Sequence, residues 1–223
     1  MKKYLFWRLS FYAAGMVMMA LGGCLGNRSG LGVNPISAVS FSFTQAFGIS
    51  FSTTTLVLYC LFIGLQFLLR GRNPRWRDLL QLPFTFVFSA MLEIFDRIIS
   101  FRAQTVVQGL ILLILSIVII GVGISLSVTM QLVPNPADGL LETLSCKLNK
   151  ELGLTKNLED AVCAAIAFFV DLSFGTLWAS IGVGTVVSMI LLGRIISLFN
   201  RFFGSKVLAL AGLENKDDSS VSG

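Results

Sequence analysis

Residues 105–128 read TVVQGLILLILSIVIIGVGISLSV, an apolar run without a single charged side chain. A helix needs about 20 such residues to cross the hydrocarbon core of a bilayer. A continuous apolar run of this length is the pattern of a transmembrane helix. Only 13% of the chain is charged, against about 25% in soluble domains, and 55% is hydrophobic. The chain is therefore predicted to be an all-α, multi-pass protein embedded in a lipid bilayer.

Six spans are predicted from runs of this kind. They lie at about 7–26, 52–70, 78–96, 105–128, 158–176 and 180–203. Basic residues gather beside alternate spans: Lys2, Lys3 and Arg8; Arg70, Arg72, Arg75 and Arg77; Lys147, Lys150 and Lys156; Arg201 and Lys206. The positive-inside rule places these segments, and with them both termini, in the cytoplasm of a bacterium whose cytoplasmic (inner) membrane holds the protein. Residues 1–203 are predicted to form one transmembrane domain, and 204–223 a polar cytoplasmic tail that is partly disordered.

Two halves of the chain resemble each other at a shift of 101 residues. Residues 30–37 read GLGVNPIS and residues 131–138 read QLVPNPAD, so that Asn34-Pro35 corresponds to Asn135-Pro136. Each copy, at about 7–98 and 105–203, holds three spans and one short helix that begins at Asn-Pro. Because three is odd, the second copy must enter the membrane in the opposite direction. The predicted fold is therefore two inverted repeats, an arrangement that builds many secondary transporters. The alternative is a duplicated bundle without a pathway.

The repeat also bears on the N-terminus, where a basic start and an apolar core end at Leu21-Gly22-Gly23-Cys24. This pattern would fit a removed signal or a lipid anchor. Because the segment has a partner in the second copy, we interpret it as a retained first span.

The two Asn-Pro elements are predicted to start short helices at 36–47 and 137–152. Proline suits the first helical turn, and the asparagine before it can cap the helix with its side chain. A helix that begins at membrane depth directs free N–H groups and a positive dipole end at whatever lies in front of it. Two such ends from an inverted pair are expected to define an anion-friendly or polar site near the middle of the membrane. The alternative is that both helices lie flat on opposite membrane surfaces.

An aquaporin is the first interpretation that NPA suggests, and the sequence argues against it. In aquaporins the Asn-Pro helix follows the second span of a repeat, whereas here it follows the first. Asp138 stands where a cationic residue is normal, and the chain contains no histidine.

Ionisable groups inside apolar spans are costly and are candidates for function. We predict that the solute site is formed by Asn34, Pro35, Ser37, Asn135, Pro136 and Asp138. Glu93, Asp171 and Arg194 are predicted to gate or couple it. Glu93 corresponds to Arg194 at the repeat shift, so an inverted pair would place opposite charges close together. The alternatives are that Glu93 lies near the outer interface and that Arg194 extends to the cytoplasmic one.

The chain lacks the residues that several classes of function require. Without histidine, a nucleotide-binding loop or a nucleophile motif, the chain is predicted not to be an enzyme. The four cysteines show no metal-ligand spacing, so neither a metal nor a cofactor is expected. The net charge of +5 is explained by membrane orientation, and no nucleic-acid partner is expected.

Four motifs together resemble the bacterial YczE/YitT-like integral membrane proteins, over about residues 8–203. They read LGVNPIS, LLQLPFTFVFSAMLEIFD, NPADGLLETLS and GVGTVVSMILLGRIISLF. The resemblance implies a multi-pass inner-membrane protein whose molecular function is largely unassigned. Such proteins often carry an acidic residue shortly after the first Asn-Pro proline. This chain has Ser37 there and keeps the acidic version only at Asp138.

The leading hypothesis is a small transporter or permease-like protein for an unidentified small solute or ion. The alternative is a membrane scaffold or accessory subunit that docks a cytoplasmic partner through the arginine-rich loop at 70–77. A homo-oligomer is compatible with either hypothesis.

Overall fold

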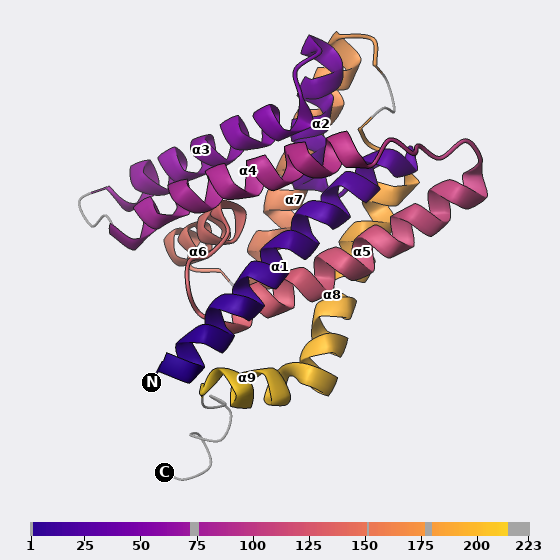
Figure 1. The fold of residues 1–223 in the computed structure, drawn as a ribbon. Helices are drawn as coiled ribbons and strands as arrows, with labels where there is room; N and C mark the ends of the chain where they lie inside the picture. Colours follow the sequence, from indigo (N-terminus) through magenta and orange to yellow (C-terminus); the bar gives the residue numbers. More distant parts are fainter. Residues whose placement is uncertain (1, 72–75, 151, 177–179, 214–223) are drawn as a thin grey trace.

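The computed structural model describes residues 2–71, 76–150, 152–176 and 180–213, and every regular element in those residues is helical (Figure 1). The first half contains α1 (Lys2–Ser29), α2 (Pro35–Phe47), α3 (Phe51–Arg70), the 3-10 turn η1 (Trp76–Leu80) and α4 (Gln81–Ile98). The second half contains α5 (Val106–Thr129), α6 (Pro136–Leu148), α7 (Leu152–Ser173), α8 (Val183–Phe199), the π-helical segment η2 (Asn200–Gly204) and α9 (Ser205–Ala211). The prediction of an all-α membrane protein is thereby confirmed.

Five stretches in the described residues are long and apolar enough to cross a membrane. They are Tyr4–Ser29, Phe51–Arg70, Asp78–Ile98, Val106–Thr129 and Val183–Ala211. The sixth predicted span, 158–176, is also helical, as α7, but it is not among these five. Every 18-residue stretch of α7 contains Lys156, Glu159 and Asp160, which makes it too highly charged to qualify. The molecule is a multi-pass membrane protein, and five of the six predicted spans meet the length and composition of a membrane crossing.

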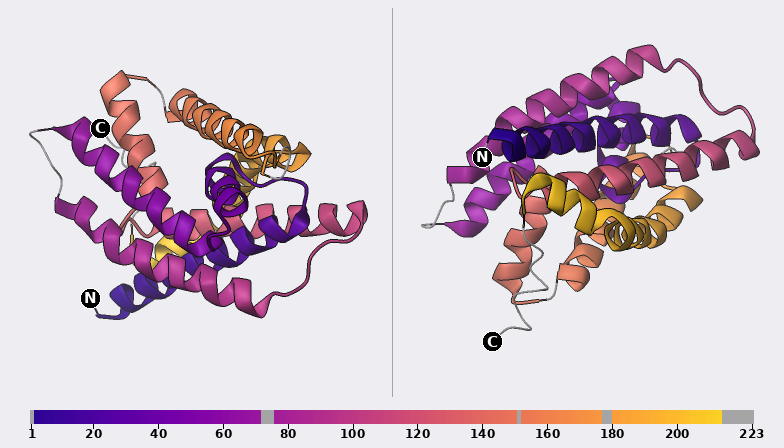
Figure 2. Two further views of the ribbon diagram at one scale, coloured as in Figure 1. Left: turned by 90° about the horizontal axis from the view of Figure 1, so that it is seen from above. Right: turned by 60° about the horizontal axis from the view of Figure 1, so that its bottom comes forward.

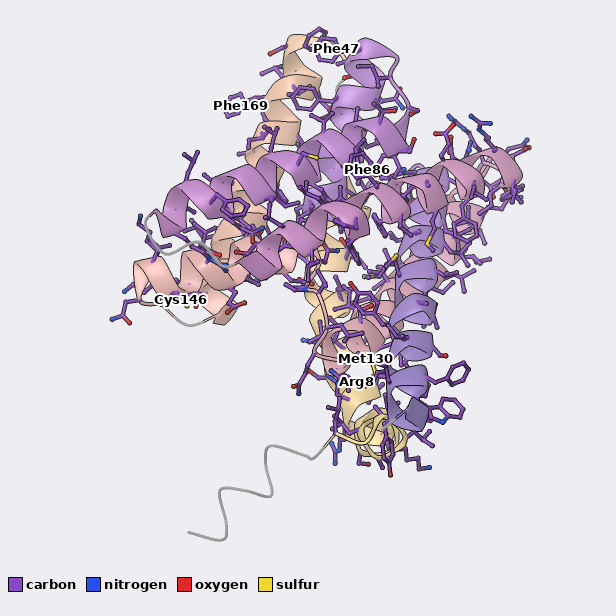
Figure 3. All side chains as sticks on the ribbon, turned by 60° about the vertical axis from the view of Figure 1, so that its left-hand side comes forward. Arg8, Phe47, Phe86, Met130, Cys146 and Phe169 are labelled. Atoms are coloured by element: carbon purple, nitrogen blue, oxygen red, sulfur yellow. The ribbon has the colours of Figure 1, made fainter. Side chains whose placement is uncertain are left out.

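Helices α1 and α5 pack against each other along most of their length and run antiparallel. Small residues bring the two backbones close together, as in many membrane helix pairs. The Ser116 hydroxyl donates a 2.7 Å hydrogen bond to the Gly22 carbonyl. At one end of the pair, a guanidinium nitrogen of Arg8 donates to the Met130 carbonyl at 2.8 Å (Figure 3).

The two short helices each pack on a long helix of the other half of the chain. Helix α2 lies along α7, and α6 lies along α3. Viewed from above, α2 is seen nearly end-on at the centre of the molecule (Figure 2). The C-terminal end of α2 meets the end of α7, where the Phe47 and Phe174 rings are 4.9 Å apart. The end of α6 meets the end of α3, where the Lys147 ammonium donates to the Leu69 carbonyl at 2.9 Å.

A buried amide pair joins α3 to α4. The Gln66 and Gln81 side chains donate to each other at 3.1 and 3.0 Å, and both are fully buried. Gln66 also donates to the Pro136 carbonyl at the start of α6. The corresponding helices of the second half, α7 and α8, make no comparable contact in the described part of the chain. The second half is therefore more open at this place than the first.

Both ends of the described chain lie at the same end of the molecule (Figure 1). Helix α9 packs on the start of α1 and on the end of α5, where Val207 and Ala211 are buried against Leu126 and Met130. The predicted polar tail, 204–223, thus begins with a packed helix, because its first residues, SKVLALA, are mostly apolar. Residues 214–223 lie outside the described part.

Candidate functional site

Each short helix begins at an asparagine that caps it, as the Asn-Pro motif predicted. The Asn34 side-chain oxygen accepts from the Ser37 amide at 3.0 Å, and its nitrogen donates to the Ser37 hydroxyl. The Asn135 oxygen accepts from the Ala137 amide at 3.0 Å, and its nitrogen donates to the Tyr59 hydroxyl at 3.3 Å. These predictions are confirmed, because the capping signal is local in the sequence.

The two helix starts face one cavity of about 410 Å³. Five of the six residues predicted to bind solute line it: Asn34, Pro35, Ser37, Asn135 and Asp138. The sixth, Pro136, is buried behind the wall, where its carbonyl accepts from Gln66. The structure therefore brings the predicted set together, at a volume usual for small-molecule pockets. That these residues bind a solute stays a prediction.

Asp138 is the acidic residue in the first turn of α6, and it lines the cavity. No hydrogen bond to its carboxylate occurs among the described residues, although the Lys156 ammonium lies near enough to interact with it electrostatically. Burial raises the pKa of the Asp138 carboxyl above its ordinary value, and Lys156 opposes part of that rise.

Lys156 also lines the cavity, which the sequence analysis did not foresee. It was assigned to a cytoplasmic connection, but it lies in the second turn of α7. Its ammonium pairs with Asp160 at 2.6 Å and with Glu159 at 3.3 Å. The spacing of these residues, i, i+3 and i+4, is a helical ion-pair pattern and could have revealed the group.

Further polar and aromatic side chains that the sequence did not single out also line the cavity. Ser40 and Thr55 are 2% and 5% exposed, and neither hydroxyl has a hydrogen-bond partner within the described residues. The Tyr59 and Phe88 rings line it too, stacked with their centroids 5.7 Å apart. These residues come from α2, α3 and α4, so no local sequence pattern links them.

The predicted gating residues lie away from the cavity. Glu93 on α4 accepts hydrogen bonds from the Ser52 hydroxyl and from Arg97, the latter at 2.9 Å. Arg194 is exposed on α8. No ion pair joins Glu93 to Arg194 in the part of the chain that the structure describes, so the expected opposite-charge contact is absent there. A gating or coupling role for Glu93 and Arg194 stays a prediction.

Asp171 holds the connection between α7 and α8. It is 1% exposed, and its carboxylate accepts from the Ser180 amide at 3.1 Å and from the Ser180 hydroxyl at 3.0 Å. Thr176 donates more weakly to the same carboxylate. These hydrogen bonds compensate for the burial of the Asp171 carboxylate, so its burial has a structural explanation. A coupling role for Asp171 stays a prediction.

The arginine-rich loop at 70–77 is described only in part. Arg70 forms an ion pair with Asp78, and both side chains are almost entirely buried. Arg70 is therefore occupied in the fold. Arg72 and Arg75 lie outside the described residues, as does the side chain of Arg77. The prediction of a docking surface there is not tested. Within the described residues, no group of three or more His, Cys, Asp and Glu side chains could hold a metal ion.

Comparison with known proteins places this geometry in a family without an assigned activity. Residues 6–201 match DUF6198, described as a family of unknown function. The chain is 26% identical over 197 residues to the uncharacterized membrane protein YczE of Bacillus subtilis (strain 168), a match that covers 88% of this chain and 86% of that protein. The expected resemblance to YczE-like membrane proteins is thus confirmed. No solved structure matches the chain significantly.

Proposed function

Since the chain belongs to this family of unknown function, DUF6198, we propose its role from the cavity: it is a small transporter that carries a solute past the starts of α2 and α6. The observation that carries the proposal is that both Asn-Pro helix starts and the Asp138 carboxylate line one cavity of about 410 Å³. A helix bundle without a transport pathway would be more stable without this cavity, because buried polar groups that lack partners cost free energy.

The proposal includes an inverted repeat, which the contacts of α1 with α5 support. Gly22 of α1 packs on the Ser116 carbonyl and on Ile120 of α5. When every residue is replaced by its counterpart at the 101-residue shift, this contact becomes Gly123 on the Gly15 carbonyl and on Met19. That second contact is also present. A pair of antiparallel helices whose contacts exchange in this way has an approximate two-fold axis across it.

The same correspondence extends to the ends of that pair and to the short helices. Arg8 contacts the Met130 carbonyl, and the corresponding position in the other copy, Gly109, packs on the Ser29 carbonyl. We propose that α2 and α6 are half-helices that begin at the cavity and leave the membrane on opposite sides. In support, the last turn of α2 meets the end of α7 and the last turn of α6 meets the end of α3.

Helix α7 is then the sixth crossing, and the chain would return to the side on which it began. The positive-inside rule makes that side the cytoplasm. The gap between α7 and α8, where α3 and α4 pack closely in the other half, is the proposed place of opening. Closing this gap while α3 and α4 separate would expose the cavity to the opposite side, as in alternating access.

A cysteine-accessibility experiment tests the transport proposal. Ser40→Cys is introduced after the four native cysteines, Cys24, Cys60, Cys146 and Cys163, are replaced by serine or alanine. A membrane-impermeant maleimide is then applied to right-side-out and to inverted vesicles. Because Ser40 is 2% exposed and lines the cavity, we expect labelling from both sides, each in a fraction of the molecules.

Val118→Cys is the matched control, because Val118 is 40% exposed on α5, a surface that lipid covers, and it should stay unlabelled. Labelling of Ser40→Cys from one side alone, or from neither, would refute alternating access. That result would favour the alternative of a membrane scaffold or accessory subunit. No enzymatic activity is proposed under either hypothesis.

A further inference from the structure

We infer that the cavity binds a monovalent organic cation, an ammonium group on an apolar body, with its nitrogen at Asp138, Ser40 and Thr55. The inference rests on the proposed function in taking this cavity as the solute site, and it adds the class of solute. It follows from the charge of the cavity wall, its unpaired hydroxyls and its aromatic surface.

The charged side chains at the cavity include more carboxylates than ammonium groups. Asp138 and Asp160 line it, and Glu159 is buried beside them at 6% exposure. Lys156 is the single ammonium among these carboxylates, and it is already held by Asp160 at 2.6 Å and by Glu159 at 3.3 Å. Asp138 is thus the carboxylate on this wall that remains for a ligand, and a cation complements it.

The helix starts are poor anion sites in spite of their dipoles. Pro35 and Pro136 carry no N–H group, and the caps occupy the Ser37 and Ala137 amides. Two of the first donors of each helix are therefore missing or already bonded, whereas anion binding depends on free donors. At the α6 start, the Asp138 carboxylate also balances the positive end of the helix.

Two buried hydroxyls supply acceptors that an ammonium group can use. Ser40 Oγ and Thr55 Oγ1 have no partner within the described residues, and they belong to neighbouring helices that both line the cavity. Buried polar atoms in folded proteins are nearly always paired, so two unpaired hydroxyls on one wall indicate a polar ligand. These unpaired hydroxyls are an observation separate from the charges of the carboxylates.

The remainder of the wall suits an apolar body with a positive charge. Phe51, Tyr59 and Phe88 line the cavity, and the faces of aromatic rings attract ammonium groups. Leu92 of α4, Ile120 of α5 and Leu192 of α8 complete the apolar surface. A small inorganic ion would leave most of this surface without contact.

Three ligands with the same phenyl body test the inference on purified full-length protein in nanodiscs of zwitterionic lipid. They are 2-phenylethylammonium, the neutral 2-phenylethanol and the anion 3-phenylpropanoate, each titrated calorimetrically. We expect the ammonium to bind at least tenfold more tightly than the alcohol and the carboxylate not to bind. Asp138→Asn should weaken ammonium binding at least tenfold, and Thr55→Val several-fold.

Glu142→Gln is the matched control, because it removes one exposed carboxylate from the same helix, α6, outside the cavity. Equal binding of the alcohol or tighter binding of the carboxylate would overturn the inference. So would an equal effect of Asp138→Asn and Glu142→Gln. If Asp138→Asn does not fold, the ligand ranking on the wild type and the Thr55→Val result decide. Cavity labelling from both sides without ammonium binding would retain transport and reject this solute class, and the reverse result would retain the site and reject transport.

Discussion

At the scale of single residues, the two Asn-Pro helices differ where it matters for chemistry. Ser37 and Asp138 correspond at the predicted 101-residue shift, and both line the cavity. Ser37 completes a cap with Asn34, whereas Asp138 keeps its carboxylate free of hydrogen bonds from the described residues. The cavity is therefore electrostatically asymmetric even if the repeat is symmetric in its backbone. One carboxylate, rather than a symmetric pair, would determine the charge of its solute.

The burial of Asp138 predicts a pH-dependent stability. Because its folded pKa is raised, the penalty is absent below the ordinary aspartate value of about 3.9 and develops as the pH rises through the raised value. The melting temperature of Asp138→Asn should therefore exceed that of the wild type by an amount that grows as the pH rises above about 4. Tyr59, Lys156 and Glu159 interact electrostatically with Asp138, and Asp160 pairs with Lys156, so the difference reports the Asp138 carboxyl together with the response of these neighbours to its charge.

Thermal unfolding of both proteins, followed by circular dichroism at several pH values, measures this difference. A constant difference across the range would show that Asp138 has no raised pKa.

At the scale of elements, glycine determines how closely α1 and α5 approach. A methyl group on Gly123 would lie 2.8 Å from the Gly15 carbonyl oxygen and 2.9 Å from the Met19 side chain. The carbonyl belongs to the backbone of a packed helix and has little freedom to move. The cavity lies beside this pair, since Met19 of α1 and Ile124 of α5 are part of its wall. The spacing of α1 and α5 thus sets the position of one cavity wall.

Gly123→Ala is expected to destabilise the protein by about 1–3 kcal/mol, the usual cost of overpacking. Gly64→Ala is its control, because no atom lies within 4 Å of the added methyl group and alanine favours a helix by up to about 1 kcal/mol. Unfolding in increasing sodium dodecyl sulfate, monitored by tryptophan fluorescence, measures both. A Gly123→Ala protein as stable as Gly64→Ala would contradict this account of the α1–α5 contact.

At the scale of the whole molecule, the crossed packing of the short helices organises the fold. Helix α2 packs on α7 of the other half, and α6 packs on α3. Each half therefore contributes a packing partner to a short helix of the other half. The ends of the described chain meet on one side, where Gly212 packs on the Tyr4 ring. That arrangement agrees with an even number of membrane crossings. The proposed sixth crossing is α7, which carries three charges near one end, two of them paired with the third.

The number of crossings predicts the position of each terminus. Reporter fusions after Leu213 and at the N-terminus should both be active as green fluorescent protein and inactive as alkaline phosphatase, because both termini would be cytoplasmic. A phosphatase inserted after Gln104, between α4 and α5, should be active. An odd number of crossings would place the two termini on opposite sides, and an active phosphatase after Leu213 would demonstrate it.

Much of the secondary structure is determined by short segments, which is why the sequence predicts it well. The short helices predicted at 36–47 and 137–152 are found at Pro35–Phe47 and Pro136–Leu148. The second ends early because Asn149 adopts a left-handed conformation, with φ at 51°, that caps the helix. Cap residues and apolar runs act within a few neighbours along the chain, so their effect can be recognised without knowledge of the fold.

By itself, the amino-acid sequence determined that this protein is helical, that it lies in a membrane, and where its two Asn-Pro helices begin. Only the tertiary structure decided that both beginnings meet in one cavity, that Lys156 faces it, and that Glu93 and Arg194 do not form a pair. The reason is physical. Bilayer thickness and helix caps act on contiguous residues. The cavity is instead formed by the faces that the helices α1 to α8 turn toward one another, and only their packing selects those faces.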